Sequence, residues 1–99
     1  MKLVILDEAE QDLLEGFRFY EDQQEAVGSC FLDSLCADID SLQLYAGIHR
    51  VLFGKSHRLL SKRFPFGIYY TLDGDEIQVH AVLDLRRNPA WIRRRMTGS

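Results

Sequence analysis

The sequence lacks any long hydrophobic run. Its 99 residues contain no apolar stretch that approaches the roughly 20 residues a membrane-spanning helix needs. The apolar start MKLVIL is followed at once by Asp7 and Glu8, so it predicts a first strand over Lys2–Leu6 and not a signal peptide. Linkers, repeats and low-complexity segments are also missing. We therefore expect a single domain over residues 1–99, a cytoplasmic location and no membrane partner.

Cysteine is scarce as well. Cys30 and Cys36 both fall in a segment with helical periodicity, where a rotation of about 100° per residue points them in different directions. This spacing excludes a disulfide between them. We expect both to pack as small buried apolar groups in a reducing compartment.

The common catalytic and metal-binding patterns are absent. The sequence has no glycine-rich phosphate loop, no paired Cys or His at metal-ligand spacing, and no Ser/His/Asp set at a known spacing. We expect no metal and no cofactor. Among the histidines, His80 is the best candidate for chemistry, because strand alternation places it on the same face as Asp84. The alternative for His80 is a partly buried histidine that is hydrogen-bonded to a neighbour.

Positive charge is nearly absent from the first half of the chain. Residues 1–48 carry two basic and eleven acidic groups, whereas residues 49–99 carry ten basic and four acidic groups. The balances are −9 and +6, which give the net charge of −3. A basic half of this kind is typical of a protein that meets a polyanion or an acidic partner. The alternative is a solvated charged surface without a partner.

Two amphipathic helices are predicted in the acidic half. Asp7 and Glu10 have the spacing of a capping box at the start of the first helix. Gly28 is a poor residue for a helix interior, so a break is predicted over Glu25–Gly28, after which a second helix starts at Ser29. Gly47 is the expected stop of the second helix. The apolar stripes that define the two helices are Ala9, Leu13, Phe17 and Tyr20, then Phe31, Leu32, Leu35, Ile39 and Leu42.

Strands dominate the basic half. Ile48–Phe53 is ambiguous between a short strand and an apolar loop, and Pro65 separates two strands predicted at Arg58–Phe64 and Phe66–Leu72. Asp73-Gly74 predicts a type I′ hairpin turn into a last strand. In that strand, Glu76–Leu83, strict alternation directs one set of side chains toward the helices, namely Ile77, Val79, Ala81 and Leu83, and the other set away, namely Gln78, His80, Val82 and Asp84.

The order of elements predicts the fold class. Asn88 and Pro89 are typical of a helix start, with the Asn side chain as cap, so a short C-terminal helix follows the strands. The expected fold is α+β: an N-terminal strand and an antiparallel helical hairpin, packed on a three- to four-stranded, mainly antiparallel twisted sheet, and then the short helix.

Several segments together resemble the RelE/ParE toxins of bacterial type II toxin–antitoxin systems. They are FYE at Phe19–Glu21, VGSCFLDSL at the start of the second helix, RFPFGIYY at Arg63–Tyr70, and AVLDLRRNPAW at Ala81–Trp91. The resemblance extends over nearly the whole chain. It implies a growth inhibitor of the bacterial stress response, held in a toxin–antitoxin hetero-oligomer by a cognate antitoxin encoded in the same operon.

The resemblance leaves two mechanisms open. RelE-like members are metal-independent, ribosome-dependent endonucleases that cut mRNA, whereas ParE-like members inhibit DNA gyrase. By alignment with the nuclease pattern, Gly67, Asp84 and Trp91 stand where a phosphate-binding arginine, a basic or histidine group and a tyrosine would be. These three residues supply neither positive charge nor a phenolic proton. The ParE-like branch, a gyrase-binding protein and not an enzyme, is therefore the favoured prediction.

Candidate site residues follow from these two mechanisms. A nuclease would use Arg58, Arg63, His80, Arg86 and Arg87. A surface for gyrase or the antitoxin would use a partly different set, namely Arg58, Arg63, Tyr70, Arg86, Arg87, Trp91, Arg93 and Arg94. Pairing of Arg86 and Arg87 with Asp84, and a purely structural role for Trp91, are the alternatives. A non-toxic antitoxin-binding module in operon autoregulation is the further alternative for the whole chain.

Overall fold

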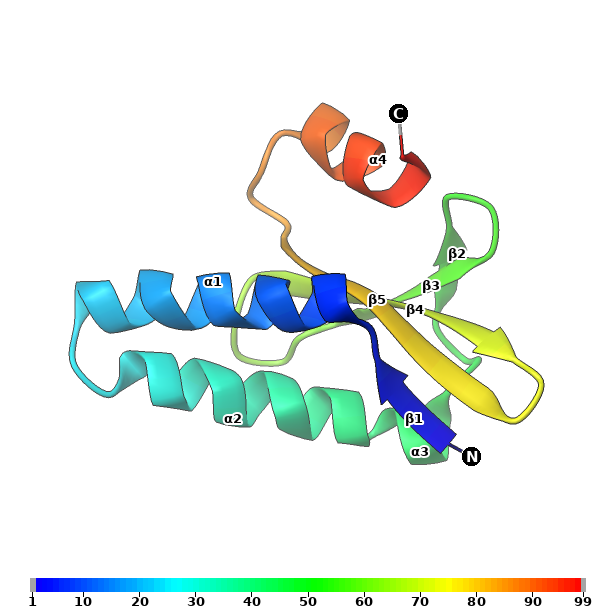
Figure 1. The fold of residues 1–99 in the computed structure, drawn as a ribbon, viewed down its shortest axis with the longest axis horizontal. Coiled ribbons are helices and arrows are strands. Elements are labelled where there is room, and N and C mark those ends of the chain that lie inside the picture. The colour runs from blue at the N-terminus through cyan, green and yellow to red at the C-terminus, as the bar shows by residue number, and fades with distance from the viewer. Residues whose placement is uncertain (1, 99) are drawn as a thin grey trace.

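A computed structural model describes residues 2–98 and confirms the α+β class. Figure 1 shows the elements in chain order. They are β1 (Lys2–Ile5), α1 (Asp7–Gln23), α2 (Val27–Asp40), α3 (Leu42–Tyr45), β2 (Arg50–Leu52), β3 (Ser56–Leu60), β4 (Phe66–Asp73), β5 (Glu76–Asp84) and α4 (Pro89–Thr97).

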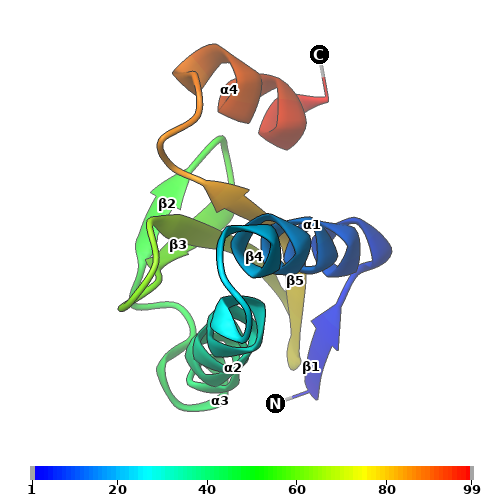
Figure 2. The same cartoon turned by 90° about the vertical axis from the view of Figure 1, so that its left-hand side faces the viewer.

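The five strands form one sheet in the order β1-β5-β4-β3-β2. β1 lies parallel to β5, and the other pairs are antiparallel, so the sheet is mainly antiparallel as expected. The hairpin of α1 and α2 covers one face, and α4 lies over the opposite face (Figures 1 and 2). The sheet is thus the middle layer between the helical hairpin and α4.

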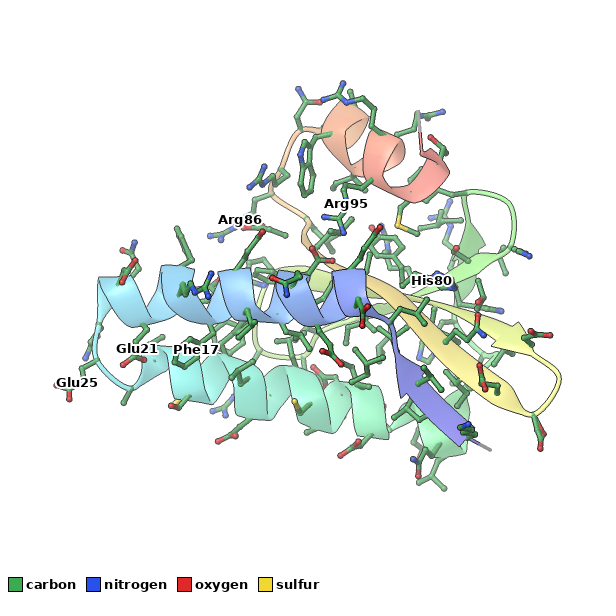
Figure 3. All side chains as sticks on the ribbon, viewed as in Figure 1. Phe17, Glu21, Glu25, His80, Arg86 and Arg95 are labelled. Carbon is green, nitrogen blue, oxygen red and sulfur yellow. The ribbon has the colours of Figure 1, made fainter. Side chains whose placement is uncertain are left out.

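The helical hairpin is held together by close backbone approach. A Cβ atom on Gly28 would lie 2.7 Å from the carbonyl oxygen of Phe17, and one on Gly16 would lie 2.4 Å from the Phe31 ring. Gly28 is therefore inside α2 and permits close packing. The predicted break is confirmed, but it ends at Ala26, and the second helix starts at Val27, two residues before the predicted Ser29. The chain turns earlier, at Ala26, which has a positive φ of 73°. Glu21 reaches across from α1 (Figure 3) and accepts hydrogen bonds from the amides of Ala26 and Gly28.

The start of α1 differs from the predicted capping box. The N-cap residue is Leu6, and no side chain caps the helix. Asp7 is instead the first helical residue, and with Glu8 and Glu10 it forms an acidic first turn that suits the positive end of the helix dipole. At α4 the prediction is confirmed, because the Asn88 side chain accepts a hydrogen bond of 2.8 Å from the Ala90 amide.

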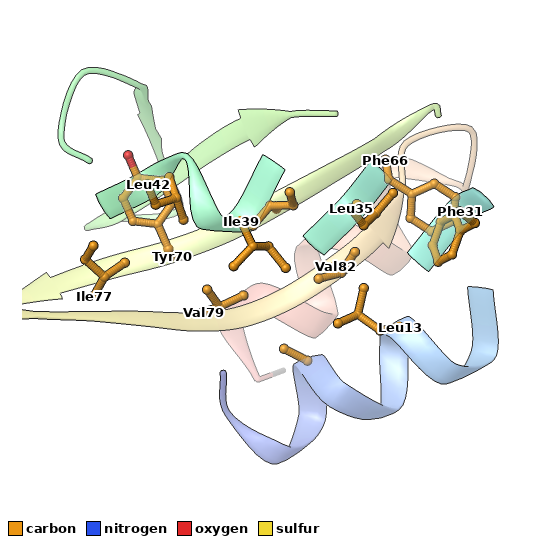
Figure 4. Close-up of a cluster of buried hydrophobic side chains, with 12 residues drawn as sticks. Leu13, Phe31, Leu35, Ile39, Leu42, Phe66, Tyr70, Ile77, Val79 and Val82 are labelled. Atoms are coloured by element: carbon orange, nitrogen blue, oxygen red, sulfur yellow. The ribbon is translucent and has the colours of Figure 1, made fainter. Parts of the chain in front are cut away.

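The main core lies between the hairpin and the sheet, and Figure 4 shows it in close-up. Phe31 packs against Phe64 and Phe66 with ring centroids 5.3 and 4.9 Å apart. A second, smaller cluster lies on the other face under α4 and contains Tyr69, Ala81, Leu83 and Ile92. The fully or nearly fully buried side chains of the main core are Ala9, Leu13, Phe31, Leu35, Ile39, Leu42, Phe66, Ile68, Tyr70, Ile77, Val79 and Val82.

A β-bulge explains why residues of β5 appear in both clusters. Tyr70 pairs with Val79 and Tyr69 pairs with Ala81, which leaves His80 as the extra residue of β5. After the bulge the alternation is reversed, so Val82 faces the hairpin while Ala81 and Leu83 face α4. The predicted orientation of the β5 side chains toward the helical hairpin is therefore correct before His80 and wrong after it.

Strand ends and turns also differ in detail from the predictions. The segment Ile48–Phe53, predicted as either a strand or a loop, contains β2. β3 ends at Leu60, four residues before the predicted end at Phe64. In the β4–β5 turn only Gly74 has a positive φ, whereas a type I′ turn needs two consecutive positive values. Two such residues occur instead in the β2–β3 turn, at Phe53 (54°) and Gly54 (89°).

The two cysteines are free, as predicted, but both are exposed on α2 and not buried. The rotation that separates them also turns each away from the apolar stripe of that helix. Within residues 2–98, no helix is long and apolar enough to cross a membrane.

One carboxylate connects α4 to the rest of the fold. Asp12 on α1 is 7% exposed, and its two oxygens accept hydrogen bonds of 2.9 and 2.8 Å from Arg95 on α4. One of these oxygens also accepts a hydrogen bond of 3.0 Å from the amide of Val82 in β5. In Figure 3, Arg95 points from α4 toward α1. A charge pair with this geometry fixes the position of α4 over the sheet.

Replacing Asp12 with alanine should destabilise the fold strongly. The variant leaves the Val82 amide and the Arg95 guanidinium without their acceptor, and removal of one partner of a buried pair costs about 3–5 kcal/mol. Because Arg95 is partly exposed, we expect the lower end of that range in urea unfolding. Glu15→Ala, an exposed carboxylate on the same helix, should change the free energy of unfolding by less than about 0.5 kcal/mol. Equal effects of the two substitutions would contradict this account.

Candidate functional site

Three of the predicted arginines line one cavity beneath the start of α4. The cavity has a volume of about 280 Å³ and contains Arg58 from β3, Arg87 from the loop after β5, and Arg93 from α4. We call it the arginine cavity. Among residues 2–98 its lining has no acidic residue, and the rest of it is apolar or aromatic, namely Leu52, Phe53, Tyr69, Leu85, Pro89 and Ile92. Three guanidinium groups around an apolar floor suit an acidic or phosphorylated partner.

Gly67 allows Arg58 to lie along the sheet. A Cβ atom at this position would lie 3.2 Å from both Cγ and Cδ of Arg58, and 3.1 Å from Leu85. The glycine that removes a charge from the nuclease pattern thus makes room for a neighbouring arginine. The Nε atom of Arg58 is buried and has no hydrogen-bond partner among the described residues. A buried charged donor without an acceptor is unfavourable, and a bound anion would relieve this.

Trp91 supports the arginine cavity from the side. Its indole ring is half-buried in the cluster under α4, and the guanidinium of Arg87 lies 4.2 Å from the ring centroid. Arg95 approaches the same ring at 5.7 Å. Such contacts hold a guanidinium group in place without neutralising its charge. Trp91 is therefore an anchor of α4 that also orients Arg87.

Arg86 lies away from the cavity and is engaged by an acidic neighbour. Its Nε and Nη2 atoms donate hydrogen bonds of 3.0 and 2.8 Å to the two oxygens of Asp84, and Nη2 lies 3.4 Å from the Tyr20 hydroxyl on the α1 side. The hydrogen bond from Arg86 lowers the pKa of Asp84. The alternative of an Asp84 ion pair is therefore confirmed for Arg86.

Arg63 and Arg94 also lie outside the arginine cavity. Arg63 lies beside Asp33 and Ser34 of α2, on the hairpin side of the sheet. Arg94 faces α1, where it shares a shallow depression with Glu8 and Glu15. Although both are exposed, the structure does not bring them together with Arg58.

Tyr70 is buried and its hydroxyl is already used within the fold. Its side chain is 0% exposed, the Gly47 amide donates to its hydroxyl at 3.0 Å, and that hydroxyl lies 2.6 Å from Nδ1 of His49. The ring of His57 stacks on Tyr70 with centroids 5.0 Å apart, and Nδ1 of His57 lies 2.9 Å from the His49 carbonyl oxygen. The placement of Tyr70 in a partner-binding surface does not agree with this burial.

Tyr69 takes the place expected for Tyr70. It lines the arginine cavity from the α4 side of the sheet, and no hydrogen bond to its hydroxyl is formed by another described residue. The sequence indicated that the two tyrosines point to opposite faces, but it did not show which face carries the arginines. The pairing of Tyr69 with Arg58 in the sheet register resolves this question.

His80 lies apart from the arginine cavity and does not share a face with Asp84, because the bulge separates the two. Its Nε2 atom lies 2.7 Å from the Thr71 hydroxyl, which agrees with the alternative of a partly buried, hydrogen-bonded histidine. Burial and nearby Lys55 lower the pKa of His80, so the neutral imidazole is favoured. Within residues 2–98, no group of three or more His, Cys, Asp or Glu side chains forms a metal site.

The fold has a known counterpart among solved structures. A chain of the chromosomal ParDE TA system from P. aeruginosa superposes with a TM-score of 0.81, over 86% of this chain and 96% of that chain. The two sequences are 21% identical, so the match establishes a shared fold. No family model matches the chain, and no curated protein matches it.

The stability of the fold should decrease on acidification through His49. Burial, and secondarily the nearby His57, lower the pKa of His49 in the folded state. Its contribution is therefore complete above the unfolded value of about 6.5 and is lost as the pH falls toward the lower folded value. We expect a lower free energy of unfolding at about pH 5.5 than at about pH 7.5. The His49→Asn variant keeps an acceptor for Tyr70 but does not titrate, so its free energy of unfolding should fall less between these two pH values. An equal decrease in the two proteins would contradict this role of His49.

Proposed function

We propose that this chain is the toxin of a ParE-like toxin–antitoxin pair, which inhibits growth in the cytoplasm by binding DNA gyrase. A cognate antitoxin, encoded in the same operon, neutralises it in a hetero-oligomer. The observation that carries the proposal is the arginine cavity, in which Arg58, Arg87 and Arg93 line an apolar floor and no acidic group is contributed by residues 2–98. The fold shared with a ParDE chain supports the same class.

The chemistry of the cavity favours binding over catalysis. Cleavage of RNA by its 2′-hydroxyl needs a base for that hydroxyl and an acid for the leaving oxygen. The part of the lining that the structure describes includes no imidazole and no carboxylate, and the one candidate imidazole, His80, lies elsewhere. What the cavity offers is positive charge beside apolar surface. An acidic segment with one or two apolar anchors fits this combination, whether it comes from gyrase or from the antitoxin.

The alternative is a RelE-like mRNA endonuclease, and Tyr69 is the observation that favours it. A phenol in the lining beside three arginines supplies the proton donor that Trp91 cannot supply. If this alternative holds, Tyr69→Phe should abolish ribosome-dependent mRNA cleavage while the variant still folds. The partners would then be the ribosome and mRNA in place of gyrase.

The proposal predicts that toxicity depends on the arginine cavity. Induced expression in bacteria should arrest growth, and the purified protein should inhibit supercoiling by gyrase. Arg58→Gln/Arg93→Gln removes two of the three charges, and we expect inhibition to weaken by at least about tenfold, which corresponds to ~1.4 kcal/mol of binding free energy. Circular dichroism and thermal melting would establish that the variant folds.

The matched control is Lys62→Gln/Arg63→Gln, which removes the same charge at exposed positions outside the cavity. It should retain inhibition. Undiminished supercoiling together with mRNA cleavage on ribosomes would exclude gyrase as the target. If the protein binds the antitoxin encoded beside it tightly but its expression does not arrest growth, the alternative of a non-toxic antitoxin-binding module would be favoured.

A further inference from the structure

A second and larger cavity lies under the other end of α4. It has a volume of about 680 Å³ and is bounded by the last residues of α4, the first turn of α1, and β3, β4 and β5. We call it the polar cavity, after its lining residues Glu8, Lys55, Ser56, Thr71 and His80. A concave site of this size with a few converging polar groups is typical of small-molecule binding. The proposed function does not use it.

The floor of the polar cavity is a row of three polar side chains on neighbouring strands. Thr71 and His80 are joined by the 2.7 Å contact between Oγ1 and Nε2. The pairing of His57 with Tyr70 continues by one position to place Ser56 beside Thr71. The bulge at His80 turns its imidazole toward this side of the sheet, where it lines the cavity. Bulges often redirect a side chain toward a functional site.

Ser56 is the strongest indication of a ligand. Its side chain lines the cavity although the residue is only 8% exposed. Its hydroxyl forms no hydrogen bond with another described residue. The imidazole of His80 uses only Nε2 for Thr71, so its Nδ1 atom is also free of bonds within residues 2–98. Two polar groups without protein partners therefore face one cavity. Neither is a buried unsatisfied atom, so a bound molecule would take the place of water at them.

Opposite charges flank this floor. Lys55 lies on the β2–β3 turn, and Asp7 and Glu8 lie on the first turn of α1. None of the three belongs to an ion pair, because the ion pairs among residues 2–98 are Arg86–Asp84 and Arg95–Asp12. Burial and Lys55 lower the pKa of His80, and Glu8 raises it, as expected for charges that lie near the floor.

The walls are apolar and one of them is held in an unusual conformation. Phe53 has a φ of 54°, a value that bulky side chains rarely adopt. The ring packs in the cluster under α4 with Met96, and both residues line the polar cavity. Val4 and Leu6 add apolar surface near β1.

We propose that the polar cavity binds a small zwitterion of amino-acid size with an apolar side chain. Its ammonium group meets Glu8, its carboxylate meets Lys55 and the Ser56 hydroxyl, and its apolar part packs against Phe53 and Met96. A doubly charged anion is disfavoured by Asp7 and Glu8, and a simple cation by Lys55. The proposal does not rest on the ParE-like function, although Phe53 lines both cavities.

The test is a titration of the full chain with L-leucine, followed by NMR. We expect saturable shifts of the His80 ring signals and the Ser56 amide, with a dissociation constant below about 10 mM. N-acetyl-L-leucine lacks the ammonium group and L-leucinamide lacks the carboxylate, so each should bind at least about tenfold more weakly. Equal binding of the three probes, or no saturable shift with L-leucine, would overturn the proposal.

Charge-removing variants assign the two ends of the ligand. Glu8→Gln should weaken binding of L-leucine at least about tenfold but leave the weaker binding of N-acetyl-L-leucine unchanged. Lys55→Gln should weaken L-leucine binding and leave that of L-leucinamide unchanged. Glu25→Gln and Lys62→Gln, at exposed positions outside the cavity, are the matched controls and should bind like the unmodified protein. All four positions are exposed, so the variants are expected to fold. Binding unaffected by Glu8→Gln and Lys55→Gln would overturn the proposed orientation.

Discussion

The charge pair between Asp12 and Arg95 is the constraint on which the position of α4 over the sheet depends. Asp12 also accepts the Val82 amide, so one buried carboxylate connects α1, β5 and α4. The hydrogen bond to Val82 falls just after the bulge, where the strand changes face. Fixing α4 at this point places Arg93 over one cavity and Met96 over the other. Both cavities therefore depend on Asp12, which lines neither of them.

Much of the fold is predictable from local sequence patterns. The helical stripes, the β4–β5 hairpin and the Asn88-Pro89 helix start are local signals, and the structure confirms each of them. The bulge at His80 is different, because an extra residue in a strand leaves no mark in an alternating pattern and is fixed only by the partner strand. Gly28 illustrates the same difficulty: its closeness to Phe17 is a tertiary contact, and by propensity alone it predicts a helix break.

The candidate site is harder to predict than the fold, because similar arginines have different partners. Arg86 is engaged by Asp84 and Arg95 by Asp12, whereas Arg58, Arg87 and Arg93 form no ion pair among residues 2–98. Arg87 nevertheless adds to the effect of Arg86 in lowering the pKa of Asp84. Sequence position does not separate these classes, since Arg86 and Arg87 are neighbours. The basic half of the chain is thus partly structural. The free positive charge is concentrated where Gly67 leaves room for Arg58 and where Trp91 orients Arg87.

The docking of α4 has a consequence for the order of folding. Its ion pair joins residues 12 and 95, which are 83 positions apart in the sequence, and its apolar contacts require the finished β4–β5 ladder. Contacts that close such long loops form after local ones. We therefore expect α4 to dock late and to open readily by local unfolding. Because this helix is the roof of both cavities, a single opening event exposes both to solvent, and anything bound in either cavity slows hydrogen exchange throughout the helix.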